Sequence, residues 1–278
     1  MKGENQKKVI INFLLIILMV ICLYPIVIML LGSFKTAQEL SSNPSGFPAN
    51  PTLENYILVF THNNGLIIHS FLNSIFVCVA NTLLTLVISA MAAYAFAKCN
   101  FKGRNVIFFA LLATMMVPTE LTIPPLYILF SKVKMLSSYS VQIFPTVANV
   151  FALYMIRQYM YSIPNAMLEA AKIDGAGHWR IFTRIVLPTI TPVLSALGIL
   201  VFLNRWNEYL WPSIMVSKER LQPLLVILPR LTRGTNILSI PWELVLAGCS
   251  VASIPIFVIF FIFQKRFMAS VVLGSIKE

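Results

Sequence analysis

The chain has 278 residues, of which 58% are hydrophobic and only 11% are charged, and its formal net charge is +11. Soluble domains are about 45–50% apolar and about 25% charged, so a water-soluble globular protein is excluded because too few charges are available to cover its surface. The expected solvent is lipid. The basic residues lie mostly in short links between apolar runs, which indicates membrane topology and argues against nucleic-acid binding.

Apolar runs of membrane-spanning length recur along the whole chain. A helix needs about 20 apolar residues to cross the bilayer core, so the sequence predicts an all-α integral membrane protein with six transmembrane helices. The predicted spans are residues 9–32, 70–97, 105–131, 139–160, 189–211 and 242–264. Residues 161–188, between the fourth and fifth spans, are predicted to form a cytoplasmic insert. The chain 1–278 is expected to form a single transmembrane domain.

The first span follows a basic N-terminus, as a signal peptide would. Its apolar stretch, Val9 to Leu31, is too long for a typical signal sequence, and no small-x-small cleavage site follows it. We therefore expect an uncleaved transmembrane helix.

The first external link, Ser33 to His69, contains SSNPSGFPANPTLENY, whose prolines and glycine are typical of a loop. Apolar residues then recur at i, i+3, i+4 and i+7, which predicts one face of a short helix with Thr52 as its N-cap. These residues are Leu53, Tyr56, Ile57 and Phe60. The helix is expected either to lie on the outer membrane surface or to pack on the protein's own loops.

Small residues and prolines mark several predicted spans. Rows of small residues let helices approach closely in lipid; they are Ser89, Ala93, Ala97, Gly248 and Ala252. Prolines are expected to kink the spans because each removes a backbone donor; they are Pro25, Pro118, Pro124, Pro125, Pro145 and Pro255.

An even number of spans places both termini on one side of the membrane. Basic residues favour the cytoplasmic side, and they predict cytoplasmic N- and C-termini here. The segments assigned to that side contain Lys2, Lys7, Lys8, Lys98, Lys102, Arg104, Arg157, Lys172, Arg180, Arg184, Lys265, Arg266 and Lys277.

The cytoplasmic insert has the pattern of a helix, a tight turn and a second helix. Pro164 can open the first helix, and Asp174-Gly175 is a typical turn pair. The second helix is predicted from His178 to Val186, ending before Pro188, which would start the next span.

No pattern in the chain indicates a metal site, a cofactor or an enzyme. The cysteines and histidines are scattered without metal-ligand spacing, and no G-x-x-x-x-G-K-[ST], HExxH or GxSxG sequence occurs.

The insert resembles the signature of inner-membrane permease subunits of ABC importers. That signature is Glu-Ala-Ala, three residues, Gly, nine residues, then Ile-x-Leu-Pro, and Glu169 to Pro188 match every fixed position and both gaps. The resemblance implies a coupling helix that docks on an ATP-hydrolysing subunit. The residues it implies for this contact are Glu169, Ala170, Ala171, Asp174, Gly175 and Ala176.

The same resemblance implies the partners and the location. The chain would pair with a second, homologous permease subunit, two copies of an ABC ATPase subunit and an extracytoplasmic solute-binding protein. It would lie in the cytoplasmic membrane of a prokaryote, and ATP hydrolysis would belong to the ATPase.

Other segments are similar to the carbohydrate-uptake branch, of the maltose-permease type. They are FPANPTLENY, Asn73-Ser74-Ile75, AYAFAKCNFKGR, MVPTELTIPPLY, Asp174-Gly175-Ala176 and Trp206-Asn207. A sugar or sugar derivative is therefore the expected solute, and a non-sugar solute such as glycerol phosphate or a polyamine is the alternative. The tail, Gly274 to Glu278, departs from the branch, which weakens the expectation that it contacts the ATPase.

Polar residues within spans are candidates for the solute path because they are costly in lipid. Glu120 either lines the path or caps a broken helix at the outer interface. In the fifth span, Asn204, Asn207 and Glu208 are predicted to face the path, and Arg205 and Glu208 are spaced to form an ion pair. The nearby Trp206, Tyr209 and Trp211 are expected either to bind sugar or to form an interfacial aromatic belt.

Overall fold

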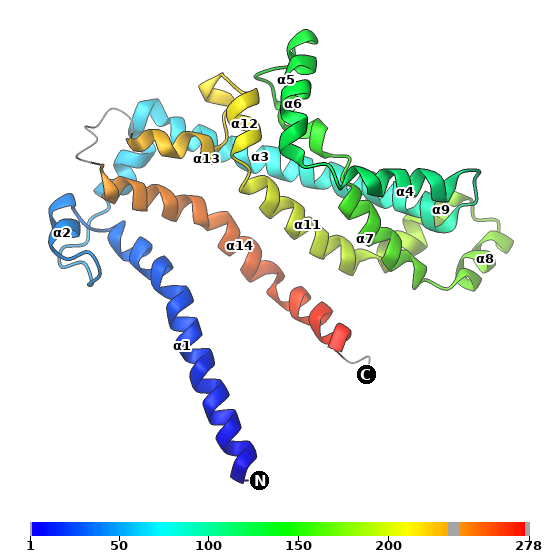
Figure 1. Cartoon of the computed structure of the whole chain (residues 1–278), viewed down its shortest axis with the longest axis horizontal. Helices are drawn as coiled ribbons and strands as arrows, with labels where there is room; N and C mark the ends of the chain where they lie inside the picture. Colours follow the sequence, from blue (N-terminus) through cyan, green and yellow to red (C-terminus); the bar gives the residue numbers. More distant parts are fainter. Residues whose placement is uncertain (1, 233–239, 276–278) are drawn as a thin grey trace. The chain divides into compact units, whose positions relative to one another are not determined.

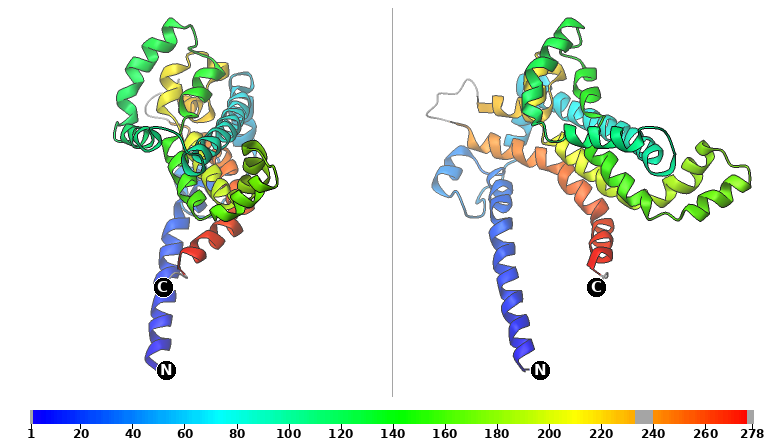
Figure 2. Two further views of the ribbon diagram at one scale, coloured as in Figure 1. Left: turned by 90° about the vertical axis from the view of Figure 1, so that its right-hand side faces the viewer. Right: turned by 45° about the vertical axis from the view of Figure 1, so that its right-hand side comes forward.

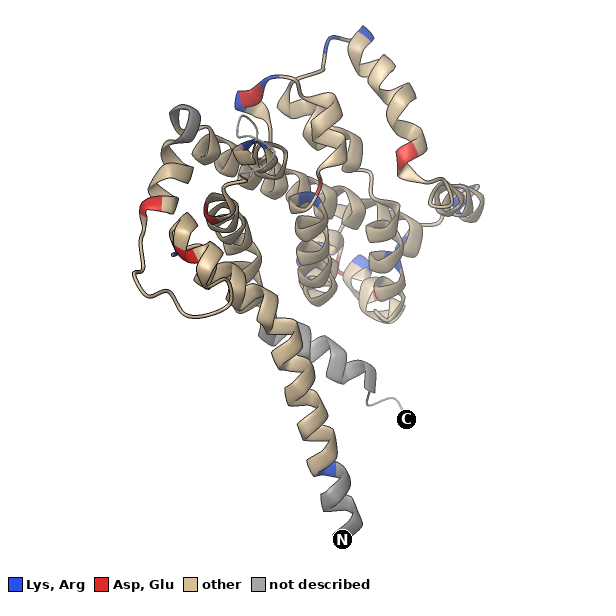
Figure 3. Cartoon of the chain, turned by 60° about the vertical axis from the view of Figure 1, so that its left-hand side comes forward, with Lys and Arg blue, Asp and Glu red and all other residues tan. Residues whose placement is uncertain are grey.

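The computed structural model describes the backbone of residues 2–232 and 240–275 and the side chains of residues 8–61, 65–232 and 240–263. Helices make up all the regular secondary structure within these ranges (Figure 1). The chain divides into two compact units, Met1–His69 with Leu224–Pro255 (unit 1) and Ser70–Pro223 with Ile256–Glu278 (unit 2). Few charged residues interrupt the described helices (Figure 3).

Three helices are long and apolar enough to cross a bilayer. Their apolar segments are Lys8–Gly32 in α1 (Lys2–Gly32), Gly65–Lys98 in α3 (Glu54–Lys98) and Trp242–Phe263 in α14 (Trp242–Ser275). Three bent helix pairs each pass the same test together, so the described residues contain up to six spans if every pair is one span. The all-α membrane fold is confirmed, and six spans remain a prediction.

The predicted second span and the short helix before it form one element, which corrects the sequence prediction. Helix α3 runs from Glu54 to Lys98, and no proline interrupts it. It continues through Gly65 although this residue has a left-handed φ of 74°. Thr52 Oγ1 accepts the Glu54 N–H at 3.1 Å, as expected of a capping residue. The predicted face is divided: Leu53 and Ile57 are exposed, whereas Tyr56 packs on the preceding loop, with its ring 5.3 Å from that of Phe34 and its hydroxyl hydrogen-bonded to Ser33 Oγ at 2.7 Å.

The predicted third span is broken. Helix α4 (Arg104–Thr114) is followed by η1 (Thr119–Thr122) and α5 (Ile123–Lys132), and the two halves are bent by 94°. The break falls at Pro118, as the missing donor predicts. Pro124 and Pro125 begin α5 instead of kinking a span.

The fourth and fifth spans are also divided. The fourth consists of α6 (Tyr139–Ile143), η2 (Phe144–Thr146) and α7 (Val150–Tyr161), with a 42° bend. The fifth, α11 (Thr191–Trp206), ends before the predicted residue 211, and α12 (Leu210–Met215) is a separate helix. By contrast, α1 and α14 each remain one helix despite Pro25 and Pro255.

The remaining short elements join these helices. They are α2 (Ala37–Ser42), η4 (Glu219–Leu221), α13 (Leu224–Ile227) and η5 (Leu228–Thr232).

The small residues predicted to allow close packing are buried. Ser89, Ala93 and Ala97 of α3 have little exposed surface, and the two alanines belong to the main hydrophobic cluster of unit 2. In unit 1, a Cβ atom added at Gly248 would lie 2.7 Å from Leu228 Cδ1 and 3.0 Å from Leu231 Cδ1. The absence of a side chain at position 248 is what lets α14 approach η5.

Replacing Gly248 with phenylalanine is therefore expected to destabilise the protein by about 1–3 kcal/mol, the usual cost of overpacking. Gly248→Ala should cost less, because the two leucine side chains can shift by a few tenths of an ångström. Thermal unfolding of the purified, detergent-solubilised protein measures the difference. Equal melting temperatures for wild type and Gly248→Phe would contradict this packing.

Candidate functional site

The insert after α7 forms the predicted helix, turn and second helix. Helix α8 (Asn165–Ile173) starts after Pro164, which occupies the N-cap position, and the second arm starts with α9 (His178–Ile181). The insert projects from the end of unit 2 where α4 and α7 also lie (Figure 1, Figure 2).

The predicted end of the second arm before Pro188 is wrong. The arm continues as a π-helix, η3 (Phe182–Val186), and then as α10 (Leu187–Thr189), and the chain bends by 74° only before α11. Pro188 has no N–H to donate to a carbonyl four residues earlier. The wider π turn accommodates this missing donor within the helix.

The turn between the two arms is a Schellman motif. Ala176 N–H donates to Ala171 O at 2.9 Å and Gly175 N–H donates to Lys172 O at 3.0 Å. Gly175 has a φ of 79°, which side chains with a Cβ atom rarely adopt, although a Cβ there would have no neighbour within 4 Å. The signature glycine is thus required by the backbone conformation rather than by lack of space.

One side of the insert is buried in the main cluster of unit 2. Leu168, Ile181, Phe182 and Val186 are almost fully buried in the same cluster as Ile156 of α7 and Ala93 of α3. This packing makes the insert part of the helical body and not a loose loop.

The other side of the insert is open and partly apolar. Ile173, at the end of α8, is 87% exposed, and Trp179 is 65% exposed. The signature residues Glu169, Ala170 and Asp174 are also exposed. An exposed apolar tip on a rigid support is a suitable surface for a protein partner.

Polar contacts tie both arms of the insert to the C-terminal turns of α3. Lys98 Nζ donates to Ile163 O at 2.8 Å and to Asn165 Oδ1 at 2.9 Å, just before and at the start of α8. Tyr94 Oη and His178 Nδ1 share a hydrogen bond of 3.2 Å at the start of α9. Tyr94 and Lys98 both belong to AYAFAKCNFKGR (Ala93 to Arg104), a segment that resembles the carbohydrate-uptake branch.

Arg157 has a structural role that the sequence did not reveal. It was assigned only to the cytoplasmic charges, but it is 9% exposed, and its Cζ lies 3.7 Å from the centroid of the Phe108 ring. Its Nε also donates to Phe96 O at 3.3 Å. The guanidinium thus joins α7 to α3 and α4. The sequence signal for this role was a single basic residue within an apolar helix.

Asn204 and Asn207 lie at the end of α11 and are both exposed. Their side-chain amides make no hydrogen bond with any other residue whose side chain is described. Leu200, four residues before Asn204, is also exposed, so this side of the helix is uncovered. The two amides therefore need water, solute or another chain as a partner.

Arg205 and Glu208 do not form the expected ion pair in the described part of the chain. Helix α11 ends at Trp206, so Glu208 is not on the next helical turn. Arg205 donates to Thr146 Oγ1, and Glu208 Oε1 accepts the Trp211 N–H at 3.2 Å. Both line a small cavity with room for about one water molecule, too small for a sugar.

The tryptophans of this region neither bind sugar nor form an interfacial belt. Trp206 and Trp211 are buried, and Trp211 Nε1 donates to Val141 O at 2.9 Å. Tyr209 alone of the three aromatic residues is exposed. Both alternatives for the two tryptophans are therefore wrong.

Glu120 lies on η1, at the bend between α4 and α5, and is exposed. Its backbone carbonyl accepts the Ile123 N–H. Its carboxylate forms no hydrogen bond with any residue that the structure describes, so it does not cap the following helix.

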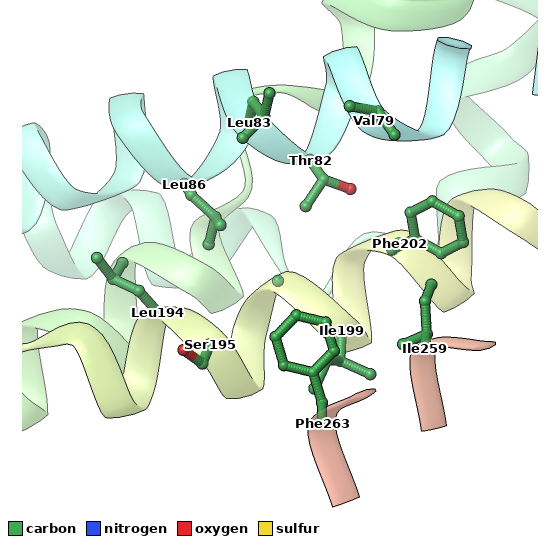
Figure 4. Close-up of a pocket in the computed structure, with 11 residues that line it drawn as sticks. Val79, Thr82, Leu83, Leu86, Leu194, Ser195, Ile199, Phe202, Ile259 and Phe263 are labelled. Atoms are coloured by element: carbon green, nitrogen blue, oxygen red, sulfur yellow. The ribbon is translucent and has the colours of Figure 1, made fainter. Parts of the chain in front are cut away.

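A larger cavity, of about 420 Å³, lies between α3, α11 and the later part of α14 in unit 2 (Figure 4). Its walls are apolar apart from the hydroxyl groups of Thr82 and Ser195. Sugars require several polar partners, so this cavity does not suit a sugar and fits hydrocarbon instead. Within the described residues, no group of three His, Cys, Asp or Glu could hold a metal ion.

Comparison with known proteins gives a family match that includes both the insert and the end of α11. Residues 85–272 match the family described as "Binding-protein-dependent transport system inner membrane component". The chain belongs to this family. It is therefore a membrane-embedded component of a transport system and not an enzyme.

Curated relatives match nearly the whole chain. The chain is 34% identical over 262 residues to the arabinooligosaccharides transport system permease protein AraQ of Halalkalibacterium halodurans, covering 92% of each chain. It is 29% identical over 281 residues to the trehalose/maltose transport system permease protein MalG of Thermococcus litoralis, covering 100% of this chain and 99% of that protein.

A solved structure has the same fold. A chain in the crystal structure of a bacterial ABC transporter involved in the import of the acidic polysaccharide alginate matches with a TM-score of 0.85. The sequence identity is 24%, and the match covers 96% of this chain and 98% of that chain.

Proposed function

We propose that this chain is one of the two membrane subunits of an ATP-driven importer that carries a sugar or sugar derivative across the cytoplasmic membrane of a prokaryote. The observation that carries the proposal is full-length similarity to permeases named for saccharides. The signature at Glu169 to Pro188, on an exposed elbow, supports ATP-driven coupling. The two units then act as one transmembrane domain with both termini in the cytoplasm.

The insert is the coupling element of this proposal. Ile173 and Trp179 provide an apolar contact surface for an ATPase subunit. Glu169 and Asp174 provide negative charge beside this surface. Closure of two ATPase subunits around ATP would move the insert. Because its inner side is packed into the cluster with α3 and α7, the motion would pass directly to those helices.

The solute path is proposed to run past Asn204 and Asn207. Exposed amides within a bilayer helix are costly unless they face water or a protein partner. A path between this chain and a second, homologous permease would supply both, and an external solute-binding protein would release sugar into it. Glu120, exposed at a helix break, is proposed to line the outer part of the path, and Glu208 to lie at its edge.

The alternative solutes are glycerol phosphate and polyamines, and a transport experiment distinguishes them from sugars. A deletion strain should lose uptake of at least one saccharide in a radiolabelled panel, and the intact gene should restore it. Loss of polyamine or glycerol phosphate uptake alone, with all saccharides unaffected, would contradict the sugar assignment.

A further inference from the structure

A polar cavity of about 500 Å³ lies beside the insert, where the ends of α3 and α7 meet the starts of α4 and α8. Its lining includes neither Ile173 nor Trp179 and neither amide of α11, and it shares only Glu169 with the surface proposed for the ATPase contact. Its lining residues come from four helices and their links.

Three cations face one carboxylate in this lining. Lys98, Arg104 and Lys172 come from different helices, and Glu169 is the acidic residue among them. Two of the cations are held in place by neutral oxygen atoms. Lys98 donates to Ile163 O and Asn165 Oδ1, and Arg104 Nη1 donates to Cys99 O at 3.1 Å and Asn100 Oδ1 at 3.2 Å. The cavity thus keeps an excess of positive charge.

The position of the cavity at the end of α3 favours a lipid headgroup as the anion. Lys98 is the last residue of the apolar segment Gly65–Lys98, which is long enough to cross the whole bilayer, so the cavity lies at the polar end of a candidate span. Tyr161, half exposed in the lining, is a residue type enriched at that level. Basic pockets between membrane helices on the cytoplasmic side bind anionic headgroups.

We propose that this cavity binds the phosphate group of an anionic membrane lipid. The phosphate would be contacted by Lys98 and Arg104 from the helical body and by Lys172 from α8. A bound lipid would therefore join the insert to α3 and α4 at the membrane surface. The site depends on the membrane location of the chain and not on the identity of the solute.

The test measures lipid binding to the full-length chain, purified with its accompanying subunits, by native mass spectrometry during titration with phosphatidylglycerol or phosphatidylcholine. The variant is Arg104→Gln with Lys172→Gln. The matched control is Lys102→Gln with Arg180→Gln, which also removes one lysine and one arginine, both exposed and outside the cavity. Thermal unfolding of both variants verifies that they are folded.

Phosphatidylglycerol is expected to bind more tightly than phosphatidylcholine. Each lost cation should cost about 1 kcal/mol of binding free energy, or about 5-fold in affinity. The variant, which loses two cations, should therefore bind phosphatidylglycerol about 30-fold more weakly. The control should not change the affinity. Equal binding by variant and control would overturn the proposal. Binding of inorganic phosphate as tight as that of phosphatidylglycerol would also overturn it, because the site would then be one for a free anion. None of these outcomes depends on transport, so failure of the sugar assignment would leave the result unaffected.

Discussion

Gly175→Val is expected to abolish solute uptake while the membrane helices remain assembled. Valine at a φ of 79° costs about 1–3 kcal/mol of backbone strain. The Schellman turn would open, and Ile173 and the signature residues would lose their fixed orientation. Uptake and ATPase activity of the reconstituted complex measure the loss, and ATP hydrolysis should no longer respond to solute.

Two further substitutions separate backbone conformation from side-chain size at this turn. Gly177→Val is the matched control, since Gly177 has an ordinary φ of −69° and equally open surroundings. Gly175→Asn should retain part of the activity, because asparagine tolerates the left-handed region better than valine. If Gly175→Val transports as well as wild type, the elbow does not transmit the motion.

Asn207→Leu is expected to lower solute uptake by about 2- to 10-fold in a complex whose basal ATPase activity is normal. Its amide is exposed at the end of α11, and losing one hydrogen bond to the solute costs about 0.5–1.5 kcal/mol. Glu208→Gln should lower uptake less, because one carboxylate oxygen already accepts the Trp211 N–H. Initial rates of uptake in proteoliposomes measure both.

Leu200→Met is the matched control for these substitutions, since Leu200 is exposed on the same helix but has no polar group. Normal uptake by both Asn207→Leu and Glu208→Gln, in complexes with normal ATPase activity, would remove α11 from the solute path.

Sequence reasoning succeeded where the physical cause is local. Apolar length predicted the long helices, Pro118 predicted the break in the third span, and Asp174-Gly175 predicted the turn of the insert. Each of these depends on residues within a few positions of one another. The sequence predicted a short helix at Leu53 to Phe60 and a separate span from residue 70, so the continuity of α3 between them was not predicted.

Contacts between distant segments could not be predicted from the sequence. The ion pair of Arg205 and Glu208 was expected from helical spacing, but α11 ends between them. Burial of Trp206 and Trp211, and the stacking of Arg157 on Phe108, depend on packing between helices far apart in the chain. The predictions for the tail and for five basic residues fall outside the side chains that the structure describes. These residues are Lys2, Lys7, Lys265, Arg266 and Lys277.

Photo-crosslinking from the tip of the insert tests most directly whether it couples this chain to an ATPase. Ile173, the most exposed large residue of the insert, is replaced with p-benzoylphenylalanine in the full-length chain, and the cells are irradiated. The same replacement at Phe47, which is 81% exposed in the segment between α2 and α3, serves as the control. We expect a crosslink to the ATP-hydrolysing subunit from position 173 and none from position 47. No crosslink to such a subunit from position 173, together with labelling of an Ile173→Cys variant by a membrane-impermeant maleimide added outside intact cells, would contradict it.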